Sequence, residues 1–187
     1  MLERRSQSTI ARLQTPLVHR HGPALGVASA AVCATVLAVS GAVGHLVDQP
    51  FLFPSLGPTL MLLSETPDTP SAHPRNVIVG HAVALATGWV ALAVTGLLHH
   101  PAALQEGIST PRIVAAALSL ALTALALQLL HTPHPPAGAT TLIVSLGLLK
   151  TGGQLLVMMT AVLLCTACTF AIRELFHRRM RVVADDE

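Results

Sequence analysis

Two short motifs of the pattern P-x-x-G-x-T hold the residues of this sequence that are best suited to contact an anion. The first is PSLGPT at residues 54–59, and the second is PPAGAT at residues 135–140, 81 positions later. Proline suits the first turn of a helix, glycine lets a ligand approach the backbone, and threonine can cap a helix start. Free N–H groups and the helix macrodipole make such a start attractive to anions. The motifs therefore predict two short helices whose N-termini face each other across a small anion.

Two cations follow the motifs, one after each copy. Arg75 comes after the first, and Lys150, the sole lysine of the chain, comes after the second. One interpretation is that each charge snorkels from a helix end to the membrane surface; the other is that the two charges attract the anion. The residues predicted to bind the substrate are Ser55, Gly57, Thr59, Arg75, Asn76, His134, Pro135, Pro136, Gly138, Thr140, Thr141 and Lys150.

Three titratable residues near these elements are candidates for a proton relay: Asp48, His81 and His134. A histidine inside a membrane is either a hydrogen-bonded packing residue or a group that passes protons, and both interpretations stay open. His131 and His134 form an H-x-x-H pair, but the intervening and following prolines argue against a helical metal pair. No Cys or carboxylate is close enough in sequence to complete a ligand set. We therefore predict no metal and no cofactor.

The composition places these motifs in a membrane. Hydrophobic residues make up 52% of the 187-residue chain and charged residues 11%, with a mean hydropathy of +0.64, whereas soluble domains carry about 25% charged residues. The arginines are concentrated at the chain ends and form no basic stripe interleaved with aromatic residues, so we expect no nucleic-acid partner. The chain is an integral membrane protein in contact with the lipid bilayer.

Four stretches are long enough to cross the hydrocarbon core, which needs roughly 20 apolar residues. Two further runs are shorter and irregular, and each contains one P-x-x-G-x-T motif. Each broken run follows one full span and precedes another, which indicates an internal repeat. The full spans are Pro23–Val47, Val77–Leu98, Ile113–Leu130 and Thr151–Ile172, and the broken runs are Gln49–Ser64 and His131–Leu149.

Two topologies fit this repeat, and both are compact all-α bundles. The first has four full transmembrane helices plus two re-entrant half-helices, and it places Arg75 and Lys150 on the same side of the membrane. The second has six crossings in an inverted 3+3 repeat, and it places them on opposite sides. The predicted parts are a basic segment at 1–22, a transmembrane domain at 23–172 with halves 23–98 and 111–172, and a tail at 173–187.

Arginines cluster before the first span and after the last one. The positive-inside rule then places both termini in the cytoplasm, with the protein in a bacterial inner membrane. Small residues spaced four apart, at Gly80, Ala84 and Gly88, predict close helix contacts within the bundle or between subunits. A homodimer is one way for so short a chain to enclose a pathway.

The motifs resemble those of the HPP family of small integral membrane proteins. Residues 134–136 occupy the tripeptide that gives the family its name, residues 53–59 match its first proline-glycine element, and residues 74–81 match its P-R-N-x-x-x-G-H element. The resemblance covers roughly residues 15–176. It implies a four-helix membrane protein, and because relatives in plastids and cyanobacteria are linked to nitrite transport, it implies nitrite as the substrate.

The preferred function is a membrane transporter or channel for a small monovalent anion. The alternative is a non-transporting membrane scaffold or sensor subunit, which would bind a partner and carry no flux. An enzyme ranks last because no nucleophile and base pair, paired carboxylates or metal set is evident in the sequence. The sequence leaves open the choice between a channel and a proton-coupled carrier, the direction of transport and the oligomeric state.

Overall fold

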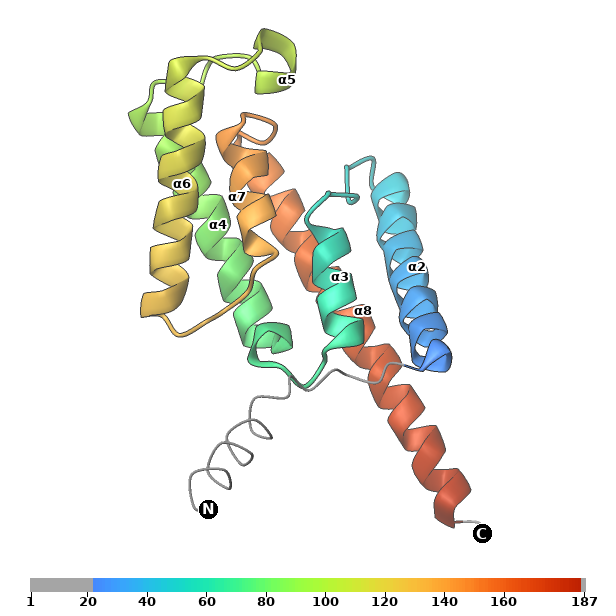
Figure 1. Ribbon diagram of the computed structural model, residues 1–187. Helices are drawn as coiled ribbons and strands as arrows, with labels where there is room; N and C mark the ends of the chain where they lie inside the picture. The colour runs from blue at the N-terminus through green and yellow to red at the C-terminus, as the bar shows by residue number, and fades with distance from the viewer. Residues whose placement is uncertain (1–21, 186–187) are drawn as a thin grey trace, which may run out of the picture.

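The computed structural model describes residues 22–185, and every regular element in that range is a helix (Figure 1). Four of the helices are long, and two short helices follow the prolines of the repeated motif. The elements are α2 Pro23–Leu46, α3 Leu56–Glu65, the 3-10 helix η1 Pro70–Ala72, α4 Pro74–Val94, α5 Ala103–Glu106, α6 Thr110–Leu129, α7 Ala137–Ser145 and α8 Gly152–Asp185.

The four long helices α2, α4, α6 and α8 confirm the predicted spans and the all-α membrane architecture. Within the described residues, these four helices are long and apolar enough to cross a membrane, with mean hydropathies of 1.8 to 2.4. Proline lies in the first turn of α2, α4 and α6, where its missing N–H leaves no donor unpaired. The helix α4 begins at Pro74, earlier than the expected Val77, because His73 caps it by accepting a hydrogen bond from the Arg75 N–H.

The first broken run returns along α2 to the end of the bundle where α2 began. Near one end of the run, Ser40 Oγ of α2 donates to the Phe51 carbonyl at 2.9 Å. Near the other end, Ser29 Oγ of α2 donates to the Ser64 carbonyl at 3.2 Å. The helix α3 has 10 residues and is therefore about 15 Å long. The extended stretch before α3 runs along the remaining length of the bundle.

The second broken run crosses in the opposite sense. It starts near η1, where His134 Nδ1 lies 2.9 Å from the Ser71 carbonyl oxygen. It ends at the far side, where Arg112 donates to the Ser145 carbonyl. As in the first run, an extended proline-rich stretch comes before a short helix, here α7 with 9 residues.

The bundle therefore has six passes and corresponds to the inverted 3+3 alternative rather than to the topology with re-entrant half-helices. The proline-rich stretches are extended instead of folding back, so each broken run reaches the opposite end. The passes of α2, α3 and α4 alternate in direction, and those of α6, α7 and α8 repeat this alternation upside down (Figure 1). Arg75 lies at the end where α2 begins, which we call the Pro23 end. Lys150 lies at the opposite end, which we call the Lys150 end.

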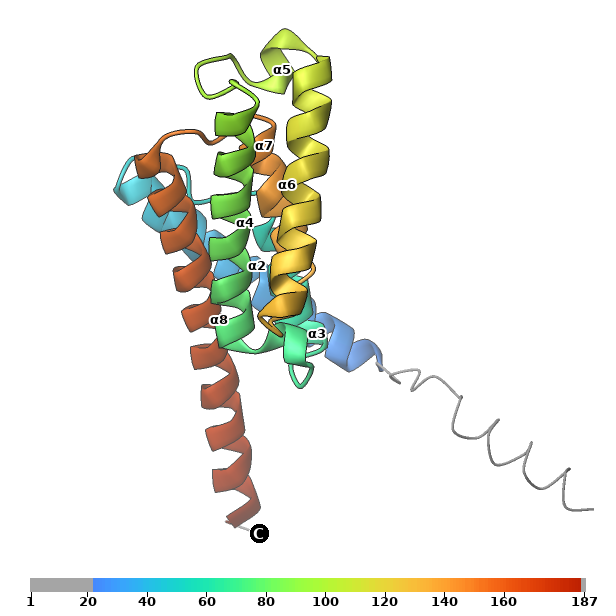
Figure 2. The same cartoon turned by 90° about the vertical axis from the view of Figure 1, so that its left-hand side faces the viewer.

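The helix α4 packs closely against the second broken run because of its small residues. A Cβ on Gly80 would lie 2.8 Å from the Cβ of His134, and one on Gly88 would lie 2.7 Å from the Cβ of Val144. The predicted stripe of small residues on α4 thus packs inside the bundle and not between subunits. Figure 2 shows α4 between α8 and α6, with α8 continuing beyond the bundle at the Pro23 end.

Candidate functional site

The threonines of the two P-x-x-G-x-T motifs meet at one buried imidazole. Thr59 lies in the first turn of α3, Thr140 lies in the first turn of α7, and His81 of α4 contacts both. The distance from His81 Nε2 to Thr59 Oγ1 is 3.1 Å, and the distance from His81 Nδ1 to Thr140 Oγ1 is 2.7 Å. All three side chains are fully buried. The fold thus brings equivalent residues of both halves to the same histidine.

His134 extends this cluster toward the Pro23 end. Its Nε2 lies 3.2 Å from His81 Nε2, and the two rings meet edge to face with their centroids 5.0 Å apart. Its Nδ1 reaches the Ser71 carbonyl, in the η1 turn that joins α3 to α4. The neighbouring prolines keep the backbone around His134 extended, and the missing Cβ of Gly80 leaves room for the His134 side chain.

The hydrogen-bond partners are consistent with one arrangement of protons on neutral histidines. A carbonyl only accepts, so His134 Nδ1 donates to Ser71, which leaves His134 Nε2 as an acceptor. His81 Nε2–H then donates to His134 Nε2, and His81 Nδ1 accepts from the Thr140 hydroxyl. The Thr59 hydroxyl donates to a carbonyl of the preceding turn and accepts from the same His81 N–H. The chain of hydrogen bonds runs in one direction, from Thr140 to Ser71.

A second chain of hydroxyls lies beside the first. Thr141 Oγ1 is 2.7 Å from Thr123 Oγ1 of α6, which is 2.6 Å from Thr87 Oγ1 of α4. The consecutive residues Thr140 and Thr141 therefore connect the start of α7 to α4 on one side and to α6 on the other.

The histidines of the H-x-x-H pair point to different environments. His134 is buried, whereas His131 is exposed and its backbone has a φ of +52°. In the part of the chain that the structure describes, no group of three or more His, Cys, Asp or Glu side chains could hold a metal ion.

The remaining residues of the two motifs surround the helix starts. The buried Ser55 Oγ at the N-cap of α3 has no hydrogen-bond partner among the described residues. Gly57 and Gly138 are half-buried, Pro136 is buried and Pro135 is exposed. The N–H groups of residues 137–139 each donate to the carbonyl three residues earlier, at 3.0 to 3.1 Å. An anion at the start of α7 must therefore replace internal hydrogen bonds.

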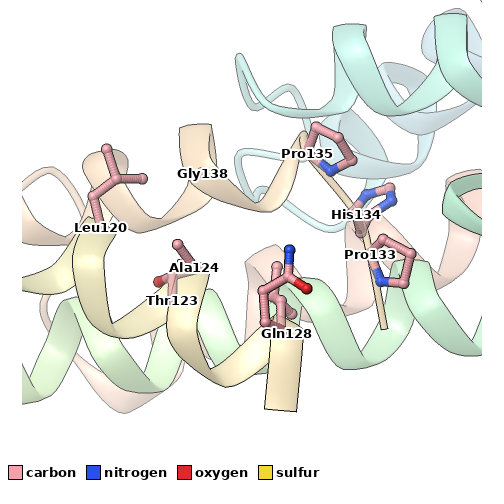
Figure 3. Close-up of a pocket in the computed structure, with 9 residues that line it drawn as sticks. Leu120, Thr123, Ala124, Gln128, Pro133, His134, Pro135 and Gly138 are labelled. Carbon is pink, nitrogen blue, oxygen red and sulfur yellow. The ribbon is translucent and has the colours of Figure 1, made fainter. Parts of the chain in front are cut away.

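A pocket of about 260 Å³ opens beside His134, between α6 and the start of α7 (Figure 3). Its wall is mostly apolar, and its polar side chains are Thr123, Gln128 and His134. This pocket is a place where a small molecule can approach the proline-rich segment. The lining residues are Leu120, Thr123, Ala124, Leu127, Gln128, Pro133, His134, Pro135 and Gly138.

Four other predicted residues lie away from His81. Arg75 is exposed at the Pro23 end, and the side chain of Asn76 beside it donates to a carbonyl of η1 at 2.8 Å. Lys150 lies at the other end, where its Nζ donates to the His100 carbonyl at 2.6 Å. Asp48 is exposed in the turn after α2, with a φ of +52°. The structure therefore does not gather these charges around the imidazoles.

The sequence patterns did not indicate Ser71, Thr87, Thr123 or Arg112. Ser71 contributes only its carbonyl, which any residue could supply, and the two threonines meet only once α4 and α6 pack together. Arg112 is fully buried, at 1% exposure. Its signal was available in the sequence, because it is a charged residue at the edge of a long stretch without Asp, Glu, Lys or Arg.

Comparisons with known proteins agree with a transmembrane protein. No solved structure matches the chain. A transmembrane protein of Dictyostelium discoideum is 32% identical over 93 residues, which make up 50% of this chain and only 27% of that relative. Residues 18–181 match the model of the family described as HPP, transmembrane region. Because this match spans nearly the whole chain, the protein belongs to the HPP family.

Proposed function

We propose that this protein is a proton-coupled transporter of a small monovalent anion, with the substrate bound where α3 and α7 begin. The observation that carries the proposal is the contact of Thr59 and Thr140 with the two nitrogens of His81. Interrupted helices at matching positions of inverted halves are typical of transporter binding sites. Hydroxyl and imidazole groups are suitable donors for an anion there.

His81 and His134 supply the proton-carrying part of this mechanism. In the neutral arrangement, His81 donates to His134, which donates to the Ser71 carbonyl. If His134 gains a proton, both of its nitrogens become donors, so His81 Nε2 must accept and His81 Nδ1–H must point to Thr140. The same contacts thus fit two proton arrangements, in which the bonds of His81 to His134 and to Thr140 reverse while His134 Nδ1–H donates to Ser71 in both. A proton taken up on one side can be held at the pair without displacing any side chain.

The lack of charged side chains in contact with the pair, among the described residues, favours joint movement of the proton and the anion. Within the described residues, no Lys, Arg, Asp or Glu side chain contacts His81 or His134. An anion buried without a positive partner is strongly disfavoured. The proton on the histidine pair provides that partner, so one proton accompanies one monovalent anion and transport is electroneutral.

Nitrite is the first substrate to test, because the motifs resemble proteins that are linked to nitrite transport. The arginine-rich segments at both ends of the sequence favour a cytoplasmic Pro23 end in a bacterial inner membrane. In that orientation, the chain from Thr140 to Ser71 points toward the cytoplasm. A homodimer remains part of the proposal, with Gly26, Ala30 and Ala34 of α2 as an exposed strip of small residues.

The decisive experiment is nitrite uptake into proteoliposomes that hold the purified protein. We expect nitrite uptake to exceed that of protein-free liposomes. A pH gradient that is acidic outside should accelerate this uptake. Clamping the membrane potential with valinomycin and potassium should leave the rate unchanged. Uptake that responds to the potential but not to the pH gradient would contradict proton coupling and favour a channel.

A non-transporting scaffold or sensor is the second candidate function. The dense packing of Gly80 against His134 favours it, because His81, Thr59 and Thr140 are fully buried in the described structure. If nitrite, nitrate and formate all fail to enter the same liposomes above the protein-free rate, the result would support the scaffold and contradict the transporter.

A further inference from the structure

Arg112 is a buried cation far from the histidine pair. It lies in the first turn of α6, at the Lys150 end, and its side chain is 1% exposed. Its Nη2 donates to the Pro101 carbonyl at 2.8 Å, and its Nη1 donates to the Ser145 carbonyl at 3.4 Å. Guanidinium groups stay protonated in proteins, so this contact region carries a full positive charge.

The surroundings do not neutralise this charge. Among the described residues, no Asp or Glu forms an ion pair with Arg112. The negative end of α7 faces the guanidinium through the Ser145 carbonyl, but Arg112 also lies at the positive end of its own helix. Each helix end is equivalent to roughly half a charge. The two helix ends thus oppose one another, and the guanidinium remains without a counter-charge, which is costly in a buried place.

Two residues whose backbones lie next to Arg112 add further observations. Ser145 Oγ is fully buried and has no hydrogen-bond partner within the described residues. Gly147 has a φ of +81°, and a Cβ there would lie 3.1 Å from Arg112 Nη1. Glycine therefore lets the backbone of residue 147 pack directly against the guanidinium, where a side chain would crowd it. A buried hydroxyl without a hydrogen-bond partner indicates that a ligand or a water binds there.

We propose that Arg112 and Ser145 form a second anion site, at the Lys150 end of the protein. The ligand is a small oxyanion such as nitrite, which can take two N–H bonds from the planar guanidinium and one O–H bond from the serine. This inference takes its ligand class from the proposed function, but it concerns binding and does not require movement. In a transporter, the anion binds at this second site before it reaches His81.

The segment around α5 covers this site. The Ala103 N–H donates to the Leu146 carbonyl at 2.9 Å, and the Ala102 Cα would lie 3.3 Å from a Cβ on Gly147. Exchange of the anion with solution therefore requires this segment to lift. An apolar pocket of about 350 Å³ also borders Arg112 between α6 and α7. Its position makes a lipid phosphate the other source of an anionic oxygen.

The test measures the thermal unfolding midpoint of the purified protein in detergent, in sodium nitrite and in sodium gluconate of equal ionic strength. Binding to the folded state raises the midpoint. We expect nitrite to raise it for the wild type and for Arg173→Gln, which alters a cation of the Pro23 end. The rise should be smaller in Arg112→Gln, where only binding near His81 remains, and the part that depends on Arg112 should need about tenfold more nitrite in Ser145→Ala, because one charge-assisted hydrogen bond is lost.

The outcomes separate this inference from the proposed function. An equal rise in Arg112→Gln, or no rise in the wild type, would overturn the second site. If Arg112→Gln does not fold, Ser145→Ala decides, because it removes only an unpaired hydroxyl. Phospholipid that co-purifies with the wild type but not with Arg112→Gln, with no effect of nitrite, would assign the site to lipid and overturn the proposal. A nitrite effect that depends on Arg112 in a protein without uptake would leave the site standing and contradict transport.

Discussion

Thr59 and Thr140 are 81 residues apart, and they contact the two nitrogens of the same imidazole, that of His81. The inverted repeat explains why they meet, because each threonine lies in the first turn of its half-length helix. The repeat does not explain the histidine. The position 81 residues after His81 is Val162, which is buried and apolar. The fold therefore builds this contact once and not twice.

Removing the Thr140 hydroxyl tests whether this contact takes part in transport. In Thr140→Val, His81 Nδ1 loses its 2.7 Å partner, while the size of the side chain is kept. We expect nitrite uptake to fall about tenfold, as for the loss of one well-formed hydrogen bond in a buried site. The matched control is Thr160→Val, because Thr160 is exposed on α8 and bonds only within its own helix. Equal rates in the two variants would remove Thr140 from the mechanism.

Replacing His134 tests proton coupling separately from anion binding. The amide of His134→Gln can still donate to the Ser71 carbonyl, but it cannot take up and release a proton at neutral pH. We expect acceleration by a pH gradient to be lost, while slower nitrite exchange between equal concentrations persists with His81 as the only imidazole that can carry the positive charge. His131→Gln is the control, because His131 is exposed in the same loop. Acceleration retained in His134→Gln would assign the coupling to another group.

The sequence predicted those parts of the architecture that depend only on the length of an apolar stretch. The four long helices agree with the four uncharged stretches, since roughly 20 apolar residues can do little else in a bilayer. The broken runs were harder, because a proline-rich stretch of their length can either fold back or extend. The choice between these depends on contacts such as Ser40 with Phe51, which a local pattern does not contain.

The candidate site was only partly predictable for the same reason. A motif can mark Thr59 and Thr140, but the residue between them comes from α4, and only packing brings it there. Arg75 and Lys150 look equivalent in sequence because each follows a motif. The inversion of the halves sends them to opposite ends of the bundle. The uncharged stretch that follows Arg112 marks it in the sequence, but the two carbonyls that it contacts are known only from the packing.

Gly80 is expected to be intolerant of any side chain. A Cβ there would lie 2.8 Å from the Cβ of His134 and 3.2 Å from its ring. Overpacking of this kind costs about 1–3 kcal/mol, so Gly80→Ala should lower the thermal unfolding midpoint in detergent. Gly26→Ala provides the control, because nothing lies within 4 Å of its Cβ position. A midpoint for Gly80→Ala equal to that of the control would show that the contact between α4 and the His134 segment is loose.

Site-directed labelling can establish the six-pass topology in the membrane itself. In a background where Cys33, Cys165 and Cys168 are replaced by alanine, single cysteines are placed at Asp48, Arg75 and Lys150. A membrane-impermeant maleimide is then added to right-side-out and to inverted vesicles. The six-pass bundle predicts that Asp48→Cys and Lys150→Cys react from one side and Arg75→Cys reacts from the other, because the first broken run crosses fully between positions 48 and 75. Reaction of all three from the same side would restore the re-entrant topology. Asp48→Cys is the internal reference, since it shares the side of Lys150→Cys in both topologies.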